Sequence, residues 1–427
     1  MEHKVSVFCL TYNHADTIRQ ALEGFVSQKT DFSYNVFVFD DSSTDGTSDI
    51  VREYEKKYPH IFDVYIPEEN TYNSPNRGKL IDDLFNKYVT GKYITWCEGD
   101  DCWIDNNKLQ LEADFLEAHD DCSMVVHDSV RFDCRDNNVY PMHVFGDKSR
   151  FLSPSEVILR KKGNVATASI MYRNKDSYMP PFFSECDVGD INRQFYSLTV
   201  GKIYYMSRIM SLYRANVPGS WTDSMNDTEK RVRHALLMLR FLAKYSSYTN
   251  NVYDDCLMSL VQANINSFYY KYGKAYSSEL DEYMLSIRGK YATIVNERIY
   301  DLILKGYHRL FDEEYIDDEF NDILKRANNI YIFGSGEFGS MLADKLLKHG
   351  YDFNCFLNSS SNDSTDNIHM GKQVCGITSV DDSSENCIVM GVGMWLYADI
   401  LPYVRQFKHT VVFWPFKIFN SLDEILN

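Results

Sequence analysis

Short apolar runs alternate with amphipathic segments through the first hundred residues of the chain. The apolar runs predict β-strands, and the segments with apolar residues on one face predict α-helices between them. In order along the chain, these predicted elements are 5–10, 15–27, 35–39, 48–58, 62–66, 78–89 and 92–97. Strands that alternate with short helices are typical of βαβ units and of a parallel sheet.

Polar residues follow three of the predicted strands directly, at 11–13, 40–41 and 98–101. In a parallel α/β sheet, ligands bind beyond the carboxyl ends of the strands. We therefore expect the three clusters to converge on one site. Its candidate residues are Thr11, Tyr12, Asn13, Asp40, Asp41, Glu98, Gly99, Asp100 and Asp101.

The pattern changes twice along the chain and predicts three domains. Residues 1–222 are expected to form an α/β catalytic domain, residues 223–327 a helical connector, and residues 328–427 a Rossmann-like α/β domain. In the last, the glycines of a Gly-x-Gly-x-x-Gly sequence lie between a predicted strand and helix, as in dinucleotide-binding turns. They are Gly334, Gly336 and Gly339.

The function of this C-terminal glycine loop stays open. An acidic residue that would bind a ribose is missing from its expected place, about 20 positions later. Redox use of NAD is therefore disfavoured. A nucleotide or sugar ligand and a scaffolding or dimerising role both remain, and the second would make the protein a homo-oligomer.

Composition narrows the class of protein. The 427 residues include 44 Lys and Arg against 61 Asp and Glu, a net charge of −17, which argues against non-specific nucleic-acid binding. The 10 cysteines are scattered without a Cys-x-x-Cys pair, so we expect reduced thiols. Neither a signal peptide nor an apolar run of about 20 residues is present, and a cytoplasmic location is expected.

The acidic cluster at 98–101 carries the clearest chemistry. Adjacent carboxylates repel each other, and oxygen ligands of this kind suit Mg²⁺ or Mn²⁺, which bind through one or two carboxylates and substrate phosphates. The alternative is an acidic surface turn that caps the next helix. The position at a strand end, beside two other polar clusters, favours metal–diphosphate binding.

Three motifs, at residues 5–13, 39–47 and 91–103, resemble in order and spacing those of family 2 glycosyltransferases of the GT-A fold. The resemblance covers about residues 1–220 and implies a nucleoside-diphosphate-sugar donor, with a UDP-sugar favoured. It places Thr11 and Tyr12 against the base and ribose, and Asp40 on the base. Asp100 would be the main ligand of Mg²⁺ or Mn²⁺, and Glu98 would take the first position of the DxD motif.

The resemblance also implies a general base at Asp190, although Asp187 and Glu185 could be confused with it. Accepting the proton of the attacking hydroxyl contributes roughly 10²–10⁴ in rate. The alternative reading of Asp190 is an N-cap of the following helix. Catalysis and capping do not exclude each other.

Other candidates are weaker. Arg77 is a candidate contact to base or phosphate, or else a solvated loop residue. Asp101, Thr167 and Trp221 are candidates for the acceptor side, although Trp221 also fits ordinary packing. Many relatives carry His where this chain has Asn216, so a metal role at that position is doubtful.

The resemblance thus implies an inverting, metal-dependent glycosyltransferase of bacterial surface glycan synthesis. Its acceptor would be a glycan or a lipid-linked glycan, and the latter would bring the protein to the inner membrane face. A nucleotidyltransferase is the rival enzyme, but residues 11–14 lack its Gly/Arg-rich phosphate loop. A non-catalytic nucleotide-sugar-binding scaffold is disfavoured by Asp100 and Asp190.

Overall fold

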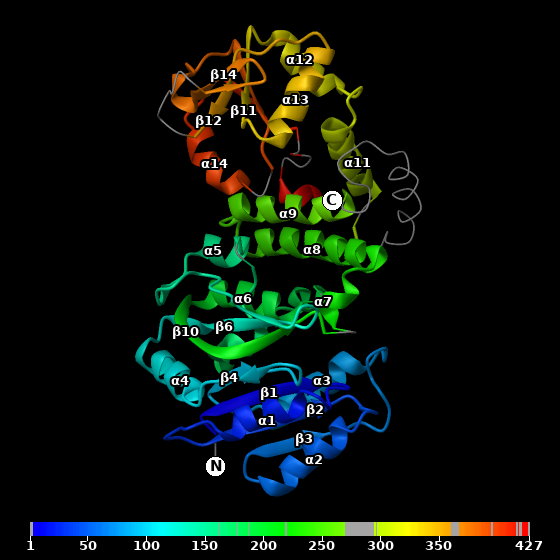
Figure 1. Cartoon of the computed structure of the whole chain (residues 1–427), viewed down its shortest axis with the longest axis vertical. Helices are drawn as coiled ribbons and strands as arrows, with labels where there is room; N and C mark the ends of the chain where they lie inside the picture. Colours follow the sequence, from blue (N-terminus) through cyan, green and yellow to red (C-terminus); the bar gives the residue numbers. More distant parts are fainter. Residues whose placement is uncertain are drawn as a thin grey trace. The chain divides into compact units, whose positions relative to one another are not determined.

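The computed structural model describes residues 3–161, 163–176, 178–186, 188–217, 220–269, 294–295, 297–359, 367–393, 396–415, 417 and 421–425. The chain divides into two compact units, the first made of residues 1–184 and 188–226 and the second of 185–187 and 227–427 (Figure 1). The helices predicted as a connector share the second unit with the C-terminal sheet.

A mixed sheet forms the centre of the first unit, in the order β3-β2-β1-β4-β9-β6-β10-β5, with β7 paired to β6 and β8 to β10. Neighbours among β1 to β4 are parallel, whereas β9 runs antiparallel to both β4 and β6. The predicted α/β class is confirmed. The strands are β1 (Val5–Thr11), β2 (Tyr34–Asp40), β3 (Phe62–Tyr65), β4 (Tyr93–Trp96), β5 (Cys102–Trp103), β6 (Cys122–Asp133), β7 (Asn138–Pro141), β8 (Arg150–Phe151), β9 (Ile170–Arg173) and β10 (Lys202–Ala215).

Helices cover both faces of this sheet, which explains why its central strands are apolar throughout rather than alternating. Along β1, Val7 packs with Leu22 of one face, while Phe8 packs with Leu84 of the other. The helices are α1 (Ile18–Val26), α2 (Thr47–Lys57), α3 (Arg77–Tyr88), α4 (Lys108–Ala118), α5 (Pro154–Leu159), α6 (Gly189–Val200) and α7 (Trp221–Ser224), with the short 3-10 turn η1 (Thr167–Ser169).

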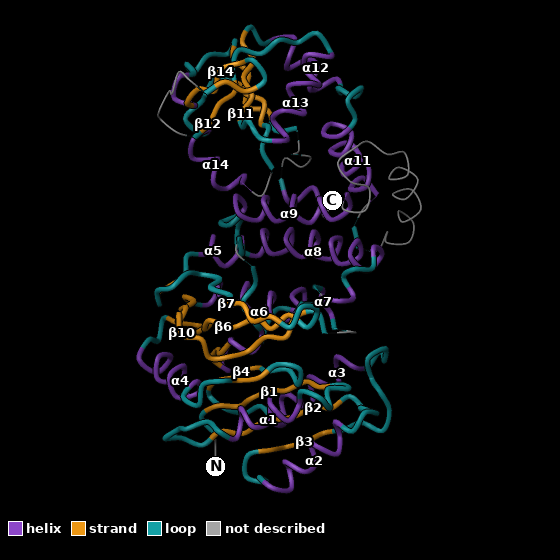
Figure 2. The backbone as a smooth tube through the Cα atoms, in the orientation of Figure 1, coloured by secondary structure: helices purple, strands orange, loops and turns teal. Residues whose placement is uncertain are grey.

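The second unit combines long helices with a smaller sheet. Helices α8 and α9 lie side by side (Figure 2), and the sheet has the order β13-β14-β12-β11-β15-β16. The elements are α8 (Thr228–Tyr248), α9 (Asp254–Tyr269), α11 (Glu297–Phe311), α12 (Asp318–Arg326), β11 (Asn329–Phe333), α13 (Glu337–Lys348), β12 (Phe356–Asn358), β13 (Ile368–His369), β14 (Lys372–Gly376), β15 (Asn386–Met390), α14 (Tyr397–Val404) and β16 (Val411–Phe413).

Two further expectations can be compared with the described residues. All ten cysteines are free, as expected. No helix within the described ranges combines the length and the apolar character needed to cross a bilayer.

Candidate functional site

The polar loops that follow β1, β2 and β4 meet at one edge of the first sheet. The backbone amide of Asp41 donates to the carbonyl oxygen of Thr11 (3.0 Å), and the amide of Gly99 donates to that of Leu10 (2.9 Å). Strand β1 lies between β2 and β4, so both neighbouring loops are fixed to its end. The predicted convergence is therefore observed.

Gly99 lets the loop after β4 approach β1 more closely than any other residue would allow. A Cβ atom at this position would lie 2.4 Å from Oγ1 of Thr11 and 2.9 Å from Nδ1 of His14, inside the contact distance of unbonded atoms. The Thr17 hydroxyl donates to the carbonyl oxygen of Gly99 (3.0 Å). Only glycine therefore fits at this position, because any Cβ atom would clash with Thr11 and His14.

Asn13 joins the loop after β1 to the loop after β2. Its backbone nitrogen donates to Oγ of Ser43, and its side-chain Oδ1 accepts from the backbone amide of Thr44, both at 2.8 Å. The next amide, that of His14, donates to Oγ1 of Thr47 (2.8 Å). Helix α1 begins at Ile18 and not at residue 15 as predicted.

Thr11 and Tyr12 differ in how far they reach the surface. Thr11 is buried, with its hydroxyl 3.1 Å from Nδ1 of His14. The Tyr12 side chain is 44% exposed. Of this predicted pair, Tyr12 offers an open ring face beside the site, and Thr11 shapes the loop beneath it.

Asp40 is fully buried and is bonded within its own loop. Its Oδ1 accepts from the Ser43 hydroxyl (2.5 Å), and its Oδ2 accepts from the Ser48 hydroxyl. Asp40 therefore holds the turn after β2 in shape. Its predicted bond to a nucleobase stays a prediction.

Asp41 and Arg77 form an ion pair that organises the segment before α3. One carboxylate oxygen of Asp41 accepts from both the amide and the hydroxyl of Thr71 (2.7 Å each), and the other accepts from Nη1 of Arg77 (2.9 Å). Arg77 is the first residue of α3, and its side chain is 25% exposed. The alternative of a solvated loop arginine is wrong, because the guanidinium is held by a buried carboxylate.

Four carboxylates share one electrostatic field at the end of β4. Burial raises the pKa of Glu98 to about 8, and the charges of Asp100 and Asp190 add to the effect. Burial, with the charges of Asp100 and Glu98, also raises the pKa of Asp101 well above its usual range. A cluster whose members resist ionisation is suited to binding a cation.

Asp190 approaches this cluster from α6. A Cβ atom on the preceding Gly189 would lie 3.6 Å from the Trp96 ring at the end of β4. Helix α6 takes Val188 as its N-cap with no side-chain cap, and Oδ1 of Asp190 accepts from the amide of Ile191 (2.8 Å). Asp190 is therefore a first-turn residue, so the alternative of an N-cap is wrong, and burial raises its pKa.

The two acidic neighbours of Asp190 differ from it. Glu185 accepts from Nζ of Lys244 (2.6 Å) and lies 3.0 Å from Nε of Arg240, within the second unit. Asp187 lies outside the described residues. Asp190 therefore remains the candidate general base.

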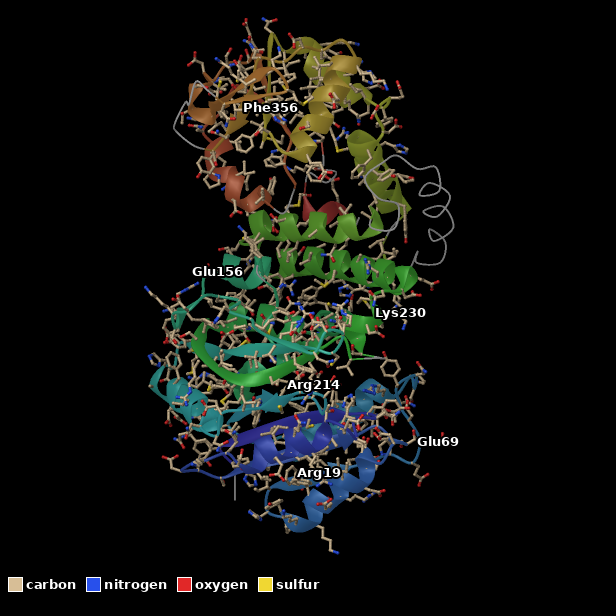
Figure 3. All side chains as sticks on the ribbon, viewed as in Figure 1. Arg19, Glu69, Glu156, Arg214, Lys230 and Phe356 are labelled. Atoms are coloured by element: carbon tan, nitrogen blue, oxygen red, sulfur yellow. The ribbon has the colours of Figure 1, made fainter. Side chains whose placement is uncertain are left out.

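Arg214, on β10, is bonded to two residues of the acidic loop. No role for it is predicted from the sequence. Its backbone amide donates to Oδ1 of Asp101 (2.8 Å), and its Nη1 donates to the carbonyl oxygen of Asp100 (2.5 Å). Figure 3 labels this arginine among the side chains of the first unit. Its partners lie 113 and 114 residues away in sequence, so no local pattern could have identified it.

Asp101 is 1% exposed, and its Oδ2 has no hydrogen-bond partner among the described residues. A buried carboxylate offers no surface to a glycan, so the structure does not place Asp101 on the acceptor side as predicted. An unpartnered carboxylate oxygen beside Asp100 is instead a candidate cation ligand.

The residues present fit a divalent cation that completes its shell with substrate oxygens. No ready-made group of three His, Cys, Asp or Glu ligands occurs in the part of the chain that the structure describes. Mg²⁺ and Mn²⁺ commonly bind through one or two carboxylates together with phosphates and water. Asp100 and the unpartnered Oδ2 of Asp101 would supply two such carboxylate ligands.

The remaining first-unit candidates lie around this edge. Thr167 begins η1, which packs against β4, β6 and β10. Trp221 begins α7 and is 45% exposed. Nδ2 of Asn216 donates to both carboxylate oxygens of Asp133 (2.8 and 2.9 Å), so its amide is used in fixing the end of β10 to β6.

The C-terminal glycines form a tight strand–helix turn. Gly334 has φ of +98°, and a Cβ on Gly339 would lie 1.9 Å from the carbonyl oxygen of Gly334. Gly336 immediately precedes α13 and has open space at its Cβ position. Close packing between β11 and α13 explains two of the three glycines without a ligand, and the role of the loop stays a prediction.

The raised carboxyl pKa values predict an unusual pH dependence of stability. Glu98 has a pKa of about 8 in the folded protein against an ordinary value of 4.5, so between these values the folded state binds more protons than the unfolded state. The free energy of unfolding therefore falls as the pH rises through this interval. We expect Tm, measured by calorimetry with EDTA, to fall from about pH 5 to about pH 8, and Glu98→Gln to flatten the slope. A Tm that rises with pH in both proteins would contradict the assignment.

Comparison with known proteins bears on the first unit. Residues 6–176 match the family model described as glycosyl transferase family 2. The chain is 28% identical over 230 residues to the uncharacterized protein Rv1520 of Mycobacterium tuberculosis, over 53% of this chain and 63% of the relative. It is 32% identical over 112 residues to the putative teichuronic acid biosynthesis glycosyltransferase TuaG of Bacillus subtilis, over 26% of this chain and 41% of the relative. The chain thus spans less than two thirds of the length of these relatives.

One solved structure has a low similarity to this chain. The crystal structure of residues 1–349 of S. aureus TarS in complex with UDP-GlcNAc is 18% identical, with a TM-score of 0.42, over 72% of this chain and 92% of that one.

Proposed function

Because residues 6–176 form a family 2 glycosyltransferase domain, we propose that this chain transfers a sugar from a nucleoside-diphosphate donor to an acceptor hydroxyl with inversion. The observation that carries the proposal is the approach of Asp190, on α6, to the acidic loop 98–101. A carboxylate that faces a diphosphate site is placed to accept a proton while the leaving group departs from the other side.

In this proposal, one group of residues binds the base and ribose of the donor, and another binds its diphosphate through a metal ion. Tyr12 and Arg77 would contact the base and ribose, with Asp40 and Asp41 fixing the loops that carry them. Asp100, with Asp101 behind it, would hold the Mg²⁺ or Mn²⁺ ion. Such an ion, when bound, supplies Lewis-acid stabilisation of the charge that develops on the diphosphate.

Asp190 would then act on the acceptor. Burial raises its pKa, and a carboxylate of raised pKa is a stronger base once it is ionised. The attacking oxygen loses its proton to Asp190 as it bonds to the anomeric carbon, and the bond to the diphosphate breaks on the opposite face. Thr167 and Trp221 are the proposed acceptor contacts.

The names of relatives suggest the kind of acceptor. Besides the putative teichuronic acid enzyme, the chain is 35% identical over 101 residues to a poly(ribitol-phosphate) beta-glucosyltransferase of Bacillus spizizenii. It is also 32% identical over 109 residues to the dTDP-rhamnosyl transferase RfbG of Shigella flexneri. We infer a role in building a cell-surface polysaccharide, with a glycan or lipid-linked glycan as acceptor.

A thermal-shift screen of nucleotide-sugars tests the proposal. A ligand that binds only the folded state increases the free energy of unfolding, by about 2.7 kcal/mol at a hundredfold excess over Kd, and this raises Tm. We expect at least one UDP-, GDP- or dTDP-sugar to raise Tm with Mn²⁺, to do so less with EDTA, and to be consumed once an acceptor glycan is added. Binding without consumption by any acceptor would favour the non-catalytic scaffold, and no shift with any donor would overturn donor binding itself.

A further inference from the structure

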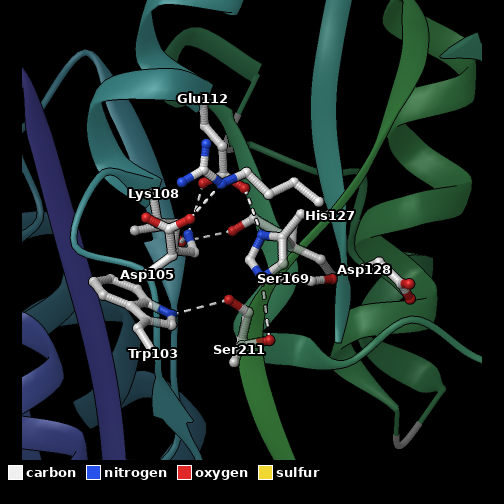
Figure 4. A network of polar contacts seen from close by, with 12 residues as sticks. Trp103, Asp105, Lys108, Glu112, His127, Asp128, Ser169 and Ser211 are labelled. Carbon is white, nitrogen blue, oxygen red and sulfur yellow. Dashed lines mark hydrogen bonds and ion pairs between the residues drawn. The ribbon is translucent and has the colours of Figure 1, made fainter. Parts of the chain in front are cut away.

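A network of buried polar side chains lies in the first unit (Figure 4). Nζ of Lys108 donates to Oε2 of Glu112 (2.6 Å), and Oε1 of Glu112 accepts from Nδ1 of His127 (2.8 Å). Nε2 of His127 lies 3.1 Å from Oγ of Ser211, which is 2.7 Å from Oγ of Ser129. All five residues are buried.

The positions of the protons in this network follow from the Lys108–Glu112 ion pair at one end. Glu112 is paired with an ammonium group and can only accept, so His127 carries its proton on Nδ1. Nε2 of His127 must then accept from the Ser211 hydroxyl. Burial lowers the pKa of His127, in keeping with a neutral ring. The network therefore holds one positive and one negative charge, on Lys108 and Glu112.

Lys108 contacts both flanks of the acidic loop. On one side, Nζ donates to Oγ1 of Thr95 (2.9 Å) in β4, three positions before Glu98. On the other side, Nζ lies 4.4 Å from the centre of the Trp103 ring in β5, two positions after Asp101. The loop between these contacts is 97–101.

The same network also includes Ser211 of β10, the strand that pairs with β5 at Trp103. Ser211 of β10 is paired in register with Ser129 of β6 and with Trp103 of β5. The indole nitrogen of Trp103 donates to the carbonyl oxygen of Ala168 (3.0 Å). A two-residue strand such as β5 gains little from its own ladder, so these side-chain contacts matter for its position.

We propose that Lys108 is a positioning residue that clamps the acidic loop 98–101 from both sides and thereby sets the separation of its carboxylates. This inference rests on the proposed function for its consequence in catalysis. Lys108 is fully buried, so its side chain is not exposed to a substrate. It acts through Thr95 and Trp103, as residues behind a metal site orient its ligands.

The variant Lys108→Met/Glu112→Gln tests the clamp. It removes both charges together, so no buried charge is left unpaired, and a glutamine oxygen can still accept from His127. In hydrogen–deuterium exchange of the full chain, we expect the peptide spanning 97–103 to exchange at least about tenfold faster, while a peptide spanning 34–40 is unchanged. We also expect UDP with Mn²⁺ to bind about tenfold more weakly.

Two further variants keep the test decisive. Thr95→Val removes one contact of Lys108 with little change of volume and should speed loop exchange in the same direction, even if the double variant folds poorly. Lys345→Met removes another buried lysine, whose Nζ donates to the carbonyl oxygen of Arg309 (2.6 Å) in the second unit. It controls for general destabilisation and should leave loop exchange and UDP binding unchanged.

The outcomes separate the clamp from the proposed function. Unchanged loop exchange in both the double variant and Thr95→Val would overturn the clamp, even if activity fell. Faster loop exchange in a protein whose unmodified form binds neither UDP, GDP nor dTDP with Mn²⁺ would support the clamp and overturn the proposed function.

Discussion

Asp190→Asn is expected to lower the rate of sugar transfer by roughly 10²–10⁴, the range that general-base catalysis contributes. Asparagine keeps the size of the side chain and its bond to the amide of Ile191 (2.8 Å) but cannot take up the acceptor's proton. Since the donor would be held by residues of the β1, β2 and β4 loops, its affinity should be retained. The measurement is kcat for transfer together with the Kd of the nucleoside diphosphate.

Glu185→Gln is the matched control for Asp190→Asn. Glu185 lies five positions earlier and pairs with Lys244 and Arg240. Loss of a partly exposed ion pair should leave transfer within about fivefold of the unmodified rate. Full transfer by Asp190→Asn would show that another group accepts the proton.

Asp100→Asn is expected to remove the activation by Mn²⁺ and to lower transfer at least about 100-fold. A divalent ion contributes several kcal/mol to the stabilisation of a leaving diphosphate, and each 1.36 kcal/mol is a factor of about ten in rate. The measurement is initial rate against Mn²⁺ concentration, with the Kd of UDP determined in Mn²⁺ and in EDTA. We expect the difference between these two Kd values to vanish in the variant.

Asp120→Asn controls for the loss of a carboxylate elsewhere on the first unit, because its side chain is wholly exposed (100%). Its Mn²⁺ dependence should match that of the unmodified protein. If Asp100→Asn kept its Mn²⁺ activation while Asp101→Asn lost it, the main ligand would be Asp101, whose Oδ2 is buried without a hydrogen-bond partner.

Periodic and local features were predictable from the sequence. The fold class is confirmed, residues 6–176 match the family 2 glycosyltransferase model, and the helix predicted over 48–58 is observed as α2 at Thr47–Lys57. Loops at the ends of parallel strands converge by geometry alone, so the meeting of residues 11–13, 40–41 and 98–101 could be anticipated.

Contacts between distant segments were not predictable. Lys108 and Glu112 have the spacing of an ordinary surface pair on a helix, and only the fold shows that both are buried. Arg214 had no predicted role and Asn216 had only a doubtful one, and their partners come from the β4 loop and from β6. Such pairings depend on how the sheet is ordered, which hydrophobic periodicity does not encode.

The late position of β10 in the chain has a consequence for how the protein folds. Strand β5 pairs with β10, so Trp103 meets its register partner Ser211 only after about a hundred further residues have been added. Strands β1, β2 and β3 pair with their neighbours in the sequence, whereas the acidic loop closes through contacts of long range, which form slowly. During synthesis, therefore, the carboxylates at 98–101 should stay exposed and mutually repelling until residues near 214 emerge, and the site should be the last part of the first unit to become ordered.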